Sequence, residues 1–298
     1  MSGPNLSLTQ IKALVALADT GSFTAASERL GVTQPAISHA IRQAEEMLQQ
    51  PLFERQRDRT VPNAAGLLAL AEARLALTHL ERLEFAVKGQ AALQSGSLRL
   101  GCFSSAVHWL LPAALAEFSR RYPAVELHVR ELADDSCVAA ILERRIDLGM
   151  VNLPCAELWT HPIFEDDICI VASGDIEISG DLRQFKDQPF VLPKGALERI
   201  VEAAFIAAGV KPRTSASVAA HGPALTLALV KASRGYTLMP RSALNTENMA
   251  ELAAAPVEPR IVRHVAFAAA SEQTASPAAR AFLDLIAENP RPEPPSLP

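Results

Sequence analysis

Apolar residues recur at helical spacing over the first 50 positions of the chain. The first such pattern predicts an amphipathic helix over about residues 7–19. Ser22 is placed to cap a second, short helix, which ends at Gly31, a residue that readily adopts the left-handed conformation of a tight turn. A third helix follows, with Thr33 as its candidate cap and Pro35 in its first turn, where a missing N–H is tolerated. The sequence therefore predicts a helix-turn-helix.

The third helix has one apolar side and one polar side. At 100° per residue, Ile37, Ile41 and Leu48 form a stripe that faces the core. The other side carries hydrogen-bonding and cationic groups, which suit the base edges of a DNA groove but are also common on solvated helix faces. The residues of this helix that we expect to contact DNA are Thr33, Gln34, Pro35, Ser38, His39 and Arg42.

A basic run directly after this helix favours the DNA-binding interpretation. In LFERQRDRTVPN, Arg55, Arg57 and Arg59 lie where a hairpin wing could contact phosphates. The first 66 residues contain six basic and six acidic side chains, so binding must depend on where the charges lie.

A second helical pattern runs over residues 63–88, with Asn63 as its cap. A helix of this length predicts a partner helix, and pairing with its own copy would give a twofold dimer. The alternative is a single helix that lies on its own domain.

Strands alternate with helices after residues 94–97, where Gln-Ser-Gly-Ser breaks the pattern. The expected strands are SLRLGCF, VELHVREL (half-exposed), IDLGMVNL, ICIVAS, FVLP, SASVA, GYTLMP and HVAFAAA. This alternation predicts an α/β domain with a mainly parallel sheet, large enough for two lobes with a cleft between them.

Composition limits the class of protein. The chain has 298 residues, of which 49% are hydrophobic and 20% charged, as in globular proteins of about two domains. A net charge of -5 argues against a basic coat for nucleic acid, although it leaves room for a local basic patch. With no signal-like N-terminus and no apolar run near the roughly 18 residues of a membrane span, we expect a cytoplasmic protein without a membrane partner.

Candidate chemistry is sparse. Cys102, Cys137, Cys155 and Cys169 include no CxxC pair, so we expect neither a zinc site nor another cofactor. One thiol of low pKa would suffice for a redox sensor, against the alternative that all four are buried small hydrophobes. GxSxG, GxGxxG, GxxxxGK[ST] and HExxH are all absent, so we expect no enzyme and assign no catalytic residue.

The stretch GSFTAASERLGVTQPAISHAIRQAEEMLQQPLFER resembles the helix-turn-helix of LysR-type transcriptional regulators. The resemblance continues, in order, through RTVPNAAG, SLRLG, RRIDLGMV, GYTLMP and SPAARAFLDLI. It implies an all-α winged helix-turn-helix followed by a two-lobed, periplasmic-binding-protein-like α/β domain. The implied parts are a DNA-binding domain (1–62), a linker and dimerisation helix (63–92), and an effector domain (93–298). The effector domain would comprise lobe I (about 96–167 and 266–288), lobe II (about 168–265) and a loose tail (289–298).

The resemblance also implies a function. Such bacterial proteins bind double-stranded promoter DNA in a sequence-specific way, and a small-molecule effector in the cleft modulates that binding. They assemble as homodimers or homotetramers and have RNA polymerase as a further partner. A departure is His39, where the family commonly has Arg or Lys, so phosphate affinity is expected to be lower. The alternatives are a solute-binding protein and a redox-sensing regulator that uses a cysteine.

The effector site is expected in the cleft. Ser104 and Ser105 follow the first strand, where hydroxyl and N–H groups could hold an anion. The other residues that fall at cleft positions of the family are Asp134, Asn152, Pro193, Lys194 and His221. A carboxylate at Asp134 would repel a purely anionic ligand and favour a zwitterion or cation. The alternative is that Asp134 is solvated and caps a helix beginning at Asp135.

Overall fold

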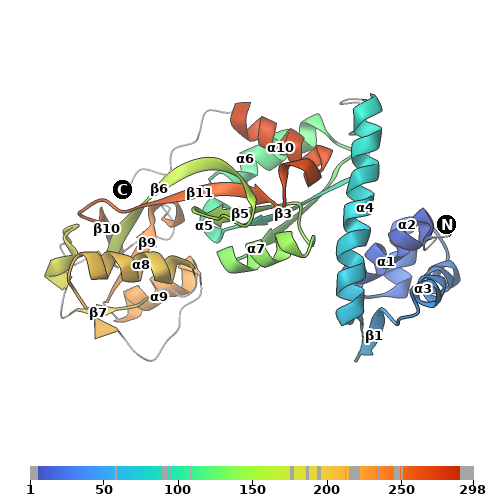
Figure 1. Cartoon of the computed structure of the whole chain (residues 1–298). Coiled ribbons are helices and arrows are strands. Elements are labelled where there is room, and N and C mark those ends of the chain that lie inside the picture. The colour runs from blue at the N-terminus through green and yellow to red at the C-terminus, as the bar shows by residue number, and fades with distance from the viewer. Residues whose placement is uncertain are drawn as a thin grey trace. The chain divides into compact units, whose positions relative to one another are not determined.

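The computed structural model forms two compact units (Figure 1). The N-terminal unit comprises residues 1–92 with the short segments 142–145 and 273–277, and the C-terminal unit comprises the rest. The residues that the structure describes are 6–57, 59–88, 93, 96–107, 109–174, 178–185, 188–192, 196–211, 213–214, 222–233, 235–244, 249 and 251–288. The expected tail at 289–298 lies outside them. Within them, no helix has the length and apolar character needed to cross a bilayer.

Three helices, a hairpin and a long helix make up the N-terminal unit. These elements are α1 (Leu8–Thr20), α2 (Phe23–Leu30), α3 (Gln34–Leu48), β1 (Phe53–Gln56), β2 (Arg59–Pro62) and α4 (Ala64–Lys88). Their shared core contains Leu14, Leu17, Ile37 and Ile41, all buried, so the predicted apolar stripe of α3 is confirmed. The expected helix-turn-helix with a following hairpin is also confirmed.

Most of the predicted helix caps are confirmed. The Ser22 hydroxyl accepts a hydrogen bond from Ala25 N, and Gly31 ends α2 with φ of 65°. Asn63 Oδ1 accepts from Gly66 N at 2.9 Å at the start of α4. Thr33 holds the N-cap position of α3, but its side chain makes no capping bond, so that predicted role is wrong. The physical reason is that the Ala36 N–H, which the Thr33 hydroxyl would have capped, donates instead to the Thr33 carbonyl oxygen at 3.0 Å.

The hairpin is fixed to the helices by backbone groups. Glu45 Oε1 accepts from Leu52 N at 2.7 Å and from Phe53 N at 3.3 Å. Thr60 N donates to Gly21 O at 2.9 Å, which joins β2 to the end of α1. These bonds hold the wing at a defined place beside α3.

The C-terminal unit is a two-lobed α/β structure. Its first elements are β3 (Ser97–Cys102), α5 (Ser104–Val107), α6 (Leu111–Arg121), β4 (Glu126–Glu131), α7 (Asp134–Leu142), β5 (Leu148–Asn152) and β6 (Trp159–Ser173). The next are η2 (Leu182–Phe185), β7 (Pro189–Phe190), α8 (Ala196–Ala207), β8 (Arg213–Thr214), α9 (Pro223–Ser233), β9 (Tyr236–Pro240) and η3 (Arg241–Ala243). The last are β10 (Leu252–Pro256), β11 (Val262–Ala269), η4 (Glu272–Thr274) and α10 (Pro277–Glu288).

The strand order is β4-β3-β5-β11-β6-β9-β7-β8, with β10 paired to β6. Strand β3 is parallel to β4 and β5, and β7 is parallel to β8 and β9. The remaining ladders, β11 with β5 and β6, and β6 with β9 and β10, are antiparallel. The expectation of a mainly parallel sheet is therefore wrong. The reason is that β6 leaves the first lobe while β11 returns to it, so the two paired strands run in opposite directions (Figure 1).

Each lobe has its own buried apolar cluster. The first contains Ile141, Ile146 and Leu158, and the second contains Phe185 and Phe190 among others. Strand β10 was not predicted, and SASVA lies outside the described residues. The alternation expected in VELHVREL is only partly present, because the edge strand β4 leaves Val129 41% exposed.

Candidate DNA-binding surface and ligand pocket

The exposed face of α3 carries the polar residues that the sequence places there. Gln34, Pro35, His39 and Arg42 are exposed, and Ser38 is half-buried. Thr33, just before the helix, is also exposed. With Ile37 and Ile41 buried on the opposite side, the helix presents donors, acceptors and a cation to solvent, as required for contact with base edges in a groove.

The wing adds positive charge next to this face. Arg55, Arg57 and Arg59 are all exposed on or beside the β1–β2 hairpin, in which Gln56 pairs with Arg59. Arg57 lies at the turn with φ of 47°. Guanidinium groups in such a place can neutralise phosphates without reading the base sequence.

Other arginines of the same unit have a structural role. Asp19 Oδ2 accepts from Arg29 Nη1 at 3.0 Å, and Asp19 Oδ1 accepts from Arg74 Nη2 at 2.6 Å. These contacts join α2 and α4 to the end of α1. Arg42 on α3 and Arg55, Arg57 and Arg59 on the wing, in contrast, are exposed.

The long helix α4 exposes several apolar side chains. Leu80, Leu83 and Val87 recur at intervals of three and four residues and are 43%, 64% and 81% exposed. Near the start of the helix, Leu67 and Leu68 are 51% and 74% exposed. Such a stripe on a helix is typical of a surface that pairs with another helix.

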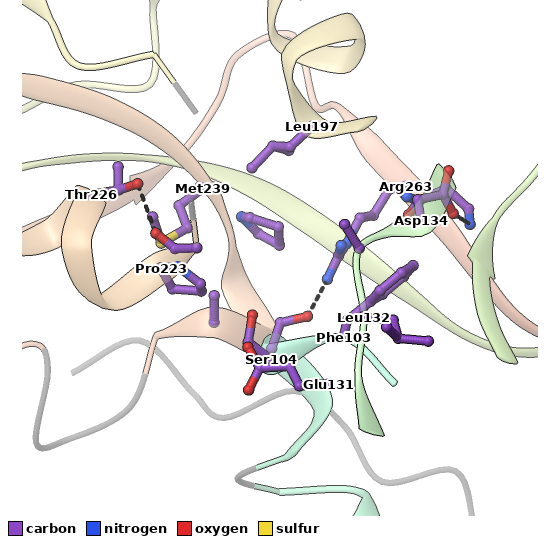
Figure 2. Close-up of a pocket in the computed structure, with 16 residues that line it drawn as sticks. Phe103, Ser104, Glu131, Leu132, Asp134, Leu197, Pro223, Thr226, Met239 and Arg263 are labelled. Carbon is purple, nitrogen blue, oxygen red and sulfur yellow. Dashed lines mark hydrogen bonds between the residues drawn. The ribbon is translucent and has the colours of Figure 1, made fainter. Parts of the chain in front are cut away.

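A cavity of about 350 Å³ lies between the lobes of the C-terminal unit (Figure 2). Its lining residues are Phe103, Ser104, Ser105, Glu131, Leu132, Ala133, Asp134, Asn152, Leu197, Gly222, Pro223, Thr226, Met239, Pro240, Ala243 and Arg263. Figure 2 shows Asp134 on one side of the cavity and Pro223, Thr226 and Met239 on the other, with the Arg263 side chain between them.

A buried network of charged and hydroxyl groups forms part of this wall. Arg263 Nε donates to Asp166 Oδ2 at 2.8 Å, and Arg263 Nη2 donates to Ser105 Oγ at 2.8 Å and Ser242 Oγ at 3.1 Å. Ser242 donates to Asp166 from both its N–H, at 2.9 Å, and its hydroxyl, at 2.7 Å. Phe103 lies beneath the guanidinium at 5.5 Å. The network links α5, β6, η3 and β11.

Asp134 is the buried carboxylate of the pocket. It is the first residue of α7, and its Oδ1 accepts from Asn152 N at 2.7 Å. Burial raises the pKa of the Asp134 carboxyl, and the bond from Asn152 partly opposes this. The alternative of a solvated cap is therefore wrong, because the side chain turns inward to the end of β5.

Four predicted effector residues line the same cavity: Ser104, Ser105, Asp134 and Asn152. Pro193, Lys194 and His221 lie outside the described residues. Sequence reasoning missed Phe103, Glu131, Thr226, Met239 and Arg263. A signal existed for Arg263 alone, as a cation within the mostly apolar strand VRHVAFAA.

The four thiols do not form a reactive centre. Burial raises the pKa of Cys102 to about 11 and the pKa values of Cys137 and Cys169 to about 12. Burial also raises the pKa of the half-buried Cys155. A redox sensor needs a thiolate at neutral pH, which these environments disfavour. In the described part of the chain, no cluster of three or more side chains could hold a metal ion.

Known proteins resemble this chain over both units. The model for the LysR substrate binding domain matches residues 91–291, and that for the bacterial regulatory helix-turn-helix protein, lysR family, matches residues 8–67. The uncharacterised HTH-type regulator YvbU of Bacillus subtilis is 26% identical over 289 residues, 95% of this chain and 98% of that protein. A probable hydrogen peroxide-inducible genes activator of Streptomyces viridosporus is 29% identical over 254 residues, 81% of this chain and 80% of that protein. A full-length OxyR variant from Pseudomonas aeruginosa has the same fold, with a TM-score of 0.76 at 20% identity over 97% of each chain.

Proposed function

Since the chain belongs to the LysR family of bacterial transcriptional regulators, we propose that α3 reads its promoter DNA and that the interlobe pocket holds the effector controlling this binding. The observation that carries the proposal is the exposed polar face of α3 beside three wing arginines. In this proposal Gln34, Ser38 and Arg42 contact base edges, and the wing contacts phosphates.

DNase footprinting of the full-length protein on the DNA upstream of its own and neighbouring genes tests the proposal. We expect protection of an inverted-repeat site that weakens as salt rises, and a footprint that changes when metabolites linked to the neighbouring genes are added. Absence of any protection at low salt, with or without added compounds, would contradict it.

Replacing Arg42 with alanine should separate base reading from general attraction to DNA. We expect affinity for the specific site to fall by about 1–3 kcal/mol, while affinity for unrelated DNA changes little. Electrophoretic mobility shifts on both DNAs measure this. Lys12→Ala is the matched control, because it removes one exposed positive charge from α1 of the same unit. An equal loss on both DNAs would remove Arg42 from base recognition.

We further propose that α4 pairs with the α4 helix of a second copy. The exposed stripe of Leu80, Leu83 and Val87 supports this arrangement, and a twofold dimer would match an inverted repeat. Assembly into a homotetramer, contact with RNA polymerase, a cytoplasmic location and the absence of catalysis belong to the same proposal.

Leu83→Glu tests the pairing of α4. A buried charge at this position should shift the protein towards monomer and reduce affinity for an inverted repeat at least tenfold. Analytical ultracentrifugation and mobility shifts provide the two readouts. Glu84→Gln, at the exposed neighbouring position, should leave both unchanged. An unchanged sedimentation profile of Leu83→Glu would exclude this stripe from the interface.

Peroxide sensing receives support from the named relatives but not from the chemistry of the thiols. The pKa values of all four cysteines are raised by burial, which favours the unreactive thiol form. The solute-binding alternative leaves the helix-turn-helix match over residues 8–67 without a role.

A further inference from the structure

We propose that the effector is an organic cation or zwitterion whose ammonium group binds Asp134 in the interlobe pocket. This inference rests on the proposed function of that pocket and specifies the chemistry of its ligand. It follows from the surroundings of Asp134, from a guanidinium that already approaches it, and from the charges of the other walls.

Asp134 is a buried carboxylate that receives hydrogen bonds from Asn152 and a longer ion pair from Arg199. Its side chain is 10% exposed, and its Oδ1 is occupied by the 2.7 Å bond from Asn152 N. The nearest described cation is Arg199, whose Nη2 lies 3.8 Å from Oδ2, beyond hydrogen-bond distance. An ionised carboxylate is costly to bury unless a cation or hydrogen-bond donors compensate it. Asp134 therefore has the capacity to accept a closer positive donor.

Arg199 indicates that a cation fits at this carboxylate. It extends from α8 in the second lobe and also lies 3.3 Å from Asp135 Oδ1 on α7 in the first lobe. Its side chain is 66% exposed, and exposed ion pairs contribute little free energy. A ligand ammonium in the pocket could lie closer to Asp134 Oδ2 than Arg199 does, within hydrogen-bond distance. It would then displace the Arg199 guanidinium from this carboxylate.

The other described walls do not favour a simple anion. The charge of Arg263 is already compensated by Asp166, at 2.7 Å. Glu131 adds a second carboxylate to the lining, and its negative charge would repel an anionic ligand. Phe103, Leu197 and Met239 contribute apolar surface, which suits a hydrocarbon or aromatic body. In a zwitterion, the ligand's own carboxylate would lie away from both Asp134 and Glu131.

Matched probes of opposite charge test this ligand class on the full-length protein. We would measure thermal unfolding with phenethylamine, agmatine and phenylalanine, and with the shape-matched acid phenylpropionate. We expect at least one amine or amino acid to raise Tm in a saturable way and the acid to have no effect. Stabilisation by the acid, or by none of the amines and amino acids, would overturn the proposal.

Asp134→Asn and Asp135→Asn form a matched pair of variants. Asparagine at 134 keeps an oxygen for the Asn152 N–H, so the fold should be retained. We expect Asp134→Asn to weaken amine binding at least tenfold, and Asp135→Asn, which changes an exposed carboxylate near the same arginine, to change it less than threefold. Equal affinity of wild type and Asp134→Asn for the amine would also overturn the proposal.

Footprinting in the presence of the same probes separates this inference from the proposed function. If phenylpropionate binds and alters the footprint, the regulatory function stands and the ligand class is wrong. If an amine binds through Asp134 but leaves the footprint unchanged, the ligand class stands and the regulatory role of the pocket is wrong.

Discussion

Arg263→Ala should destabilise the C-terminal unit by about 3–5 kcal/mol, the largest effect that we expect of a single substitution. Arg263 is 7% exposed and Asp166 is fully buried, so the variant leaves a carboxylate in the interior without its guanidinium. It also removes the donor to Ser105 and Ser242. Chemical denaturation of the full-length protein, followed by far-UV circular dichroism, measures the loss.

Arg260→Ala is the matched control for this prediction. Arg260 donates to Asp167 Oδ1 at 2.6 Å, one position along β6 from the buried pair, but its side chain is 63% exposed. Solvent screens such a pair, so we expect no measurable change.

Ser105→Ala, which removes one hydrogen bond from the network, should cost about 1 kcal/mol. If Arg263→Ala were as stable as Arg260→Ala, the network would have no role in holding the lobes.

Gly66→Ala should destabilise the N-terminal unit and weaken its binding to DNA. A Cβ at this position would overlap the Leu52 carbonyl oxygen and press on the Pro62 side chain, where α4 passes close to the wing. Relief requires backbone movement, and overpacking of this kind costs about 3 kcal/mol. Thermal unfolding of the full-length protein and mobility shifts on the specific site give the two measurements.

The sign of this change distinguishes packing from helix propensity. Gly66 lies in the first turn of α4, and alanine alone would favour the helix by about 1 kcal/mol. An increase in stability would therefore contradict the close approach. Gly31→Ala is a useful comparison, because its Cβ would meet nothing within 4 Å and only the φ of 65° is unfavourable. We expect it to cost about 1–2 kcal/mol.

The elements of the N-terminal unit could be predicted from the sequence because their signals are local. Ser22, Gly31 and Asn63 act within three or four residues, and helical spacing gives the faces. Thr33 was misjudged, since the choice between its hydroxyl and its carbonyl as acceptor depends on the geometry of one turn.

Strand direction and burial in the C-terminal unit depend on contacts that a linear pattern does not contain. Strand β11 pairs with β5 and β6, more than 90 residues earlier in the chain. The role of Arg263 depends on Asp166, 97 positions away. The inward turn of Asp134 depends on the end of β5, which places the Asn152 N–H within its reach. Family resemblance supplied cleft positions such as Asp134, but not the partners that set their chemistry.

The two strands that connect the lobes contain an irregularity with a mechanical consequence. The β6–β11 ladder shifts register between Val265 and Ala266, two residues beyond Arg263. A bulge leaves a ladder locally unpaired and lets it bend, whereas the regular pairs on either side resist bending. The ladder is therefore least regular next to Arg263, which lines the pocket. If the lobes bent at this point, Arg263 would lie near the axis and the more distant rim of the pocket would move farther.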